Sequence, residues 1–135
     1  MDNLAAVQRE ADGIFDQLWA EITLIVDAAR VKGIGLLTNG SPRNRKVLMP
    51  ATPKPGENST SARELRVDLS VDRRRITATG SSIDVVLEIG VCPDGVVCIM
   101  FAGERITLPV AGRRIMETFL SGAGSPYETI LRNSN

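Results

Sequence analysis

The chain has 135 residues, with 16 acidic side chains, 16 basic side chains and no histidine. This length is typical of one domain that can bury a core without disulfides or metals. The absence of histidine removes the commonest general base and metal ligand, and zero net charge gives no global attraction to nucleic acid or anionic membranes.

No apolar run approaches the length of a transmembrane helix, so no membrane contact is expected. The first residues carry charges where a signal peptide would carry an apolar run. A cytoplasmic protein is therefore expected.

Residues 2–32 predict one long amphipathic helix. Apolar side chains recur every three or four residues from Leu4 to Ala29, while the intervening positions are mainly charged or polar. Arg30 lies in the last turn, where the helix dipole favours positive charge, and Gly33 is a typical residue to end the helix. Such a helix would be roughly 45 Å long, whereas a typical strand covers about 20 Å. We therefore expect one end of the helix to extend beyond the sheet.

The N-terminal half of this helix is the predicted partner interface. Its apolar residues keep the three-and-four spacing of a two-helix seam. They are Leu4, Val7, Ala11, Ile14, Phe15 and Leu18. We interpret them as a docking surface, most simply for a second copy of the chain in a homodimer, with packing on the protein's own sheet as the alternative. A second apolar set predicts that the C-terminal half is covered from two directions: Ala20, Leu24, Ala28 and Val31.

After the helix, the sequence predicts an antiparallel sheet and then short helices. From Glu64 onward, apolar and polar residues alternate in short segments separated by tight turns. Strands joined by short connections usually pair with their neighbours, so we expect an antiparallel meander of five or more strands and the α+β class. The predicted single domain, 1–135, comprises a helix at 1–33, a hairpin at 34–49, a flexible loop at 50–61, a meander at 62–109 and helices at 110–135.

The charges are balanced in number but separated along the chain. Residues 1–27 hold six acids and one base, whereas residues 28–56 hold six bases and no acid. Two loops concentrate arginine and lysine, and they are the candidate anion or nucleic-acid contacts: Arg43, Arg45 and Lys46, and Arg73, Arg74 and Arg75. Charged turns that prevent unwanted strand pairing are the simpler interpretation. A nucleic-acid-binding module is the alternative function.

The sequence predicts no catalytic, cofactor or metal site. Cys92 and Cys98 have neither the C-x-x-C spacing of a redox pair nor further zinc ligands nearby, so we expect two structural thiols in a reducing compartment. Asp68, Asp84 and Glu88 lie on the polar faces of predicted strands, where no histidine or metal-binding pattern accompanies them. These carboxylates are interpreted as part of a solvated sheet face.

The expected function is a non-enzymatic protein–protein interaction module, such as an adaptor, an inhibitor or a chaperone-like protein. It would act through the N-terminal helix stripe and the charged sheet face. Its protein partner is not identifiable from the sequence. An enzyme with an unrecognised site is the third hypothesis.

Overall fold

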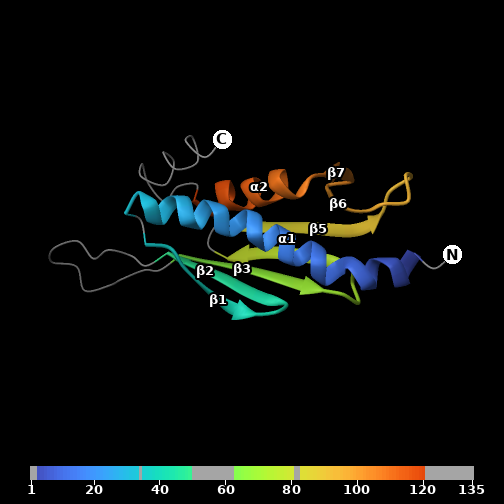
Figure 1. The fold of residues 1–135 in the computed structure, drawn as a ribbon, viewed down its shortest axis with the longest axis horizontal. Helices are drawn as coiled ribbons and strands as arrows, with labels where there is room; N and C mark the ends of the chain where they lie inside the picture. Colours follow the sequence, from blue (N-terminus) through green and yellow to red (C-terminus); the bar gives the residue numbers. More distant parts are fainter. Residues whose placement is uncertain (1–2, 34, 50–62, 81–82, 121–135) are drawn as a thin grey trace.

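In the part of the chain that the structure describes, a helix, a seven-stranded antiparallel sheet and a second helix make up the fold (Figure 1). The computed structural model describes residues 3–33, 35–49, 63–80 and 83–120. The elements are α1 (Asn3–Val31), β1 (Leu37–Ser41), β2 (Asn44–Met49), β3 (Arg63–Ser70), β4 (Arg75–Gly80), β5 (Ile83–Val91), β6 (Val97–Phe101), β7 (Glu104–Ile106) and α2 (Leu108–Leu120). The predicted α+β class and antiparallel meander are confirmed. The predicted loop at 50–61 and the part of the predicted helices at 110–135 that follows residue 120 lie outside the described residues.

Each strand pairs with its neighbour in sequence, in the order β1 to β7. The first hairpin, predicted at 34–49, does not turn at Asn39-Gly40, although such a dipeptide often forms a hairpin turn. Asn39 and Gly40 are paired within β1, and the chain reverses at Pro42 and Arg43 instead. Proline at the first central position of a β-turn already has the required φ, which favours this position over Asn39-Gly40.

Both helices cover one face of the sheet, which we call the inner face. Along β5, Ile83, Leu87 and Ile89 are buried on this side, whereas Asp84 and Glu88 point to the opposite, outer face. Because successive side chains of a strand alternate between faces, this pattern gives the sheet one apolar and one solvated surface. The core lies between the inner face and the two helices, which run side by side in Figure 1.

The apolar stripe of α1 belongs to this core. Val7 is 1% exposed, and Ala11, Phe15 and Leu18 are fully buried. Ile14 packs partly buried against the same cluster, and the side chain of Leu4 lies outside the described part of the chain. The expected overhang of the N-terminal half is therefore wrong. The prediction compared the length of the helix with that of one typical strand. The sheet covers more of the helix than this, because β3 and β5 have eight and nine residues and the first hairpin also packs on α1.

The second apolar set of α1 is not enclosed by the described residues. Leu24 is 62% exposed and Val31 is 88% exposed, so the expected covering from two directions is wrong. The reason is the position of α2, which lies against a different side of α1. A Cβ atom added at Gly112 would lie 2.8 Å from Cβ of Glu21, so the two helices approach each other closely there.

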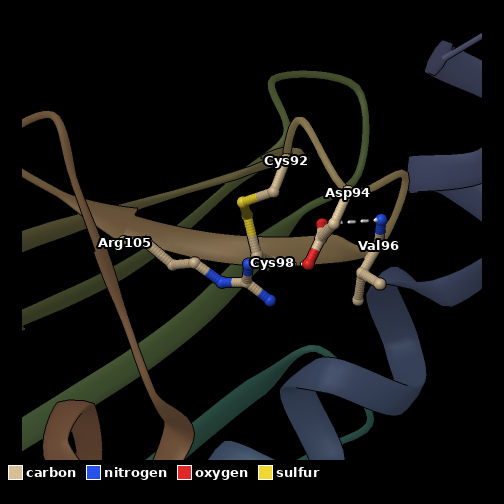
Figure 2. The surroundings of a disulfide bond; sticks show 5 residues. All are labelled: Cys92, Asp94, Val96, Cys98 and Arg105. Carbon is tan, nitrogen blue, oxygen red and sulfur yellow. Dashed lines mark hydrogen bonds and ion pairs between the residues drawn. A yellow bond between two sulfur atoms is a disulfide. The ribbon is translucent and has the colours of Figure 1, made fainter.

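A disulfide joins Cys92 and Cys98 across the turn between β5 and β6 (Figure 2), with Cα atoms 6.2 Å apart. Asp94, in the same turn, accepts a hydrogen bond from the Val96 amide and pairs with Arg105. The prediction of two free thiols is therefore wrong. The sequence spacing of a redox motif does not decide whether two cysteines can be joined across a hairpin. Here the register pairs Cys98 with Gly90, which brings Cys98 diagonally close to Cys92, two residues further along β5 and its turn. The inference of a reducing compartment loses its basis.

Replacing both cysteines by serine should lower the free energy of unfolding by about 2 kcal/mol. The cross-link joins residues six apart in sequence, and the chain-entropy relation gives this magnitude for so short a loop. Urea denaturation with and without dithiothreitol measures the effect, with mass spectrometry to count the thiols. Reduction should destabilise the wild type but leave the double variant unchanged. Equal stability of fully reduced and oxidised protein would contradict this prediction.

Candidate functional site

The basic residues of the first hairpin face the acidic residues of α1. Arg43 makes a two-pronged ion pair with Asp12, in which Nε donates to Oδ1 at 2.9 Å and Nη2 donates to Oδ2 at 3.0 Å. Two parallel hydrogen bonds of this kind orient both groups. The hydrogen bond from Arg43 lowers the pKa of Asp12, so any stability this pair contributes is present above the unfolded-state pKa and is lost as the pH falls through the lower folded-state value.

Arg45 is the most enclosed of the predicted anion contacts. Its guanidinium lies 5.0 Å from the ring centroid of Phe15 and 5.8 Å from that of Trp19, and it donates a hydrogen bond to Asp16. Only 17% of its side chain is exposed. An arginine held between aromatic faces and a carboxylate has a structural role in attaching the hairpin to α1.

These pairs account for much of the charge separation along the chain. Lys46, the third predicted contact in this loop, pairs with Glu64 of β3 at 3.2 Å. The acidic helix and the basic hairpin are therefore complementary to each other. Three of the six candidate nucleic-acid contacts are occupied by intramolecular partners.

The other three, Arg73, Arg74 and Arg75, are exposed at the β3–β4 turn. This turn lies at the same end of the sheet as the β1–β2 turn, because β2 and β3 are antiparallel and the Leu69 amide bonds to the Arg43 carbonyl. The two basic loops therefore share one end of the molecule. They do not form one free patch, since Arg43 and Arg45 are directed to α1.

The outer face of the sheet carries an ordered row of polar and charged side chains, which we call the charged row. Its members lie opposite one another across five adjacent strands: Asn39, Lys46, Arg66, Thr79 and Asp84. The row is basic over β2 and β3, uncharged at β4 and acidic at β5. Arg66 and Asp84 are exposed, and no described element covers them. The sequence predicted a solvated face, but the row depends on strand register, which the alternation pattern alone does not give.

Within the described part of the chain, no group of three His, Cys, Asp or Glu side chains is placed to hold a metal ion. None of the described helices is long and apolar enough to cross a bilayer. Comparisons with protein-family models, curated protein sequences and solved structures gave no match to this chain.

Proposed function

We propose that the protein is a non-enzymatic protein–protein interaction module that assembles as a homodimer through the outer face of its sheet. The observation that carries this proposal is the charged row, whose basic and acidic ends lie at opposite sides of a surface that no described element covers. The α1 stripe is a weaker candidate than it was in the sequence, because the protein's own sheet buries it. Nucleic-acid binding has less support, since Arg43 and Arg45 are directed to α1 and the two basic loops do not form one free patch.

The row is complementary to itself under twofold symmetry. An axis parallel to the strands, lying between two stacked sheets, exchanges β2 with β5 and β3 with β4. Lys46 pairs with Glu64 within its own chain but keeps 40% of its side chain exposed. In this arrangement Lys46 of one copy faces Asp84 of the other, and the reverse contact is identical, as an isologous interface requires. Stacked sheets normally keep their strands within about 30° of each other, so this arrangement is sterically ordinary. Val86, 40% exposed, adds apolar surface on the same face.

A charge exchange tests the proposal. Sedimentation equilibrium should show a wild-type dimer that weakens as salt is added. Lys46→Glu or Asp84→Arg alone should weaken dimerisation at least about tenfold, because each brings like charges together across the interface. The double variant, Lys46→Glu with Asp84→Arg, exchanges the charges of the facing pair and should restore association. Arg9→Glu makes the same charge change at an exposed position on α1 and should have no effect. A monomer at all concentrations would refute the dimer.

A further inference from the structure

Half of β5 has a strand on only one side. β4 pairs with β5 from Ile83 to Glu88, but β6 pairs with it only from Glu88 to Val91. The β6–β7 hairpin is short, and it reverses beyond Phe101. No strand among the described residues therefore continues beside Ile83–Leu87, which leaves an edge in the middle of a strand.

The backbone direction identifies which groups lie on this edge. The amide of Ile89 donates to the carbonyl of Arg74, so the N–H of Ile89 is directed to the β4 side. Backbone groups alternate along a strand, so those of Leu87 and Val85 also face β4. The N–H and C=O groups of Asp84 and Val86 consequently point to the free side. A row of such groups is a template for another extended chain.

A groove runs along the same edge. It has a volume of about 300 Å³ and lies between β5, the end of the β6–β7 hairpin and α2. Its lining is mainly apolar and includes two charged residues, Arg114 and Glu117. The lining residues are Val85, Leu87, Phe101, Ile106, Ala111, Arg114, Glu117 and Thr118. The side chains of a strand added to β5 would point alternately into this groove and out to the solvated face.

Arg114 gives the groove a positive charge. Its guanidinium lies 5.5 Å from the ring centroid of Phe101, and its residue is exposed. Glu117, which also lines the groove, is paired with Arg113 at 2.9 Å. Among the described residues Arg114 has no ion pair, so an acidic side chain of a bound peptide could form one with it.

We propose that an extended peptide segment of a partner protein binds in this groove as an added strand on β5. The segment would be about five residues long, with apolar side chains facing α2 and an acidic residue at Arg114. Main-chain hydrogen bonds to Asp84 and Val86 supply part of the affinity, and the groove supplies the selectivity. This inference deepens the proposed interaction function and rests on it, but it uses the backbone edge of β5 and the inner face of the sheet, whereas the dimer uses the side chains of the outer face.

Selection from a phage-displayed library of random dodecapeptides, with counter-selection against the Val86→Pro variant, tests the proposal. Proline removes the Val86 N–H, which is not used by β4, while Val86→Thr retains it. Enriched peptides should alternate apolar residues and carry an acid. Their synthetic copies should bind Val86→Pro at least about tenfold more weakly in fluorescence anisotropy and bind Val86→Thr unchanged. No enrichment, or equal binding to wild type and Val86→Pro, would overturn the proposal.

A second pair of variants guards against misfolding of Val86→Pro. Arg114→Glu should weaken binding at least about tenfold, whereas Arg114→Lys retains the charge and most of the binding. Hydrogen exchange at the Asp84 and Val86 amides should slow when peptide binds, and unchanged exchange would overturn the proposed site. Peptide binding to the Lys46→Glu variant, at a concentration at which that variant is monomeric, separates the two hypotheses. Binding by that monomer would support the groove without the dimer, and a wild-type dimer that binds no peptide would remove the groove alone.

Discussion

Replacing Phe15 by alanine should destabilise the protein by about 3–5 kcal/mol, the range for truncating a buried aromatic side chain. Phe15 is fully buried where α1, the inner sheet face and the first hairpin meet. Its ring also supports the guanidinium of Arg45 at 5.0 Å. The truncation therefore leaves a cavity and loosens the attachment of the hairpin to α1. Urea denaturation followed by far-UV circular dichroism measures the loss.

Two control variants separate packing from charge. Phe15→Leu keeps most of the apolar volume and should cost clearly less than Phe15→Ala. Asp16→Ala removes the carboxylate partner of Arg45 but leaves the stack in place, and its side chain is 64% exposed. Since exposed ion pairs contribute at most about 1 kcal/mol, this change should be small. A loss below about 1 kcal/mol for Phe15→Ala would mean that α1 is not packed as described.

Replacing Gly80 by alanine should cost at least about 3 kcal/mol, combining backbone strain with a backbone collision. Gly80 ends β4 with a φ of 143°, a region that residues with a side chain rarely adopt. A Cβ atom at this position would collide with the carbonyl oxygen of Glu64 in the neighbouring strand. Relief would require β3 and β4 to separate where Leu65 pairs with Gly80. Thermal and urea unfolding of the variant provide the measurement.

Gly13→Ala is the matched control. Gly13 lies within α1, and an added Cβ atom would meet nothing within 4 Å. Alanine has the higher helix propensity, so this substitution should stabilise the protein by up to about 1 kcal/mol. The same chemical change should therefore have opposite signs at the two positions. A Gly80→Ala variant as stable as the wild type would refute the described β3–β4 register at this residue.

Periodicity was sufficient to predict the helix and the meander. The stripe from Val7 to Ala29 and the alternation around Leu65 and Val67 follow directly from burial on one side of a helix or strand. The positions of the elements relative to one another were harder to predict. The exposure of Leu24 depends on where α2 lies, and the disulfide of Cys92 depends on the register of a hairpin turn. Neither is a local property of the sequence.

For the charged groups, too, the sequence predicts the local clusters but not how they are placed relative to one another. The sequence identified Arg43, Arg45 and Lys46 as a basic loop, and it also identified the acidic half of α1. It gave no means of knowing that the two would meet, because residues such as Arg43 and Asp12 lie 31 positions apart. The row through Arg66 and Asp84, and the free edge at Val86, likewise exist only once each strand has a defined neighbour.

The contact between α1 and α2 has a consequence for the order of folding. The strands pair with sequence neighbours, so each hairpin closes over a short stretch of chain and can form early. α1 precedes all of them, yet Glu21 packs against Gly112 of α2, the last described element. During synthesis, the apolar side of α1 must therefore wait for the whole sheet to emerge. α1 is the first part of the core to be synthesised and the last to be packed. In that interval it is an exposed hydrophobic segment of the kind that chaperones bind.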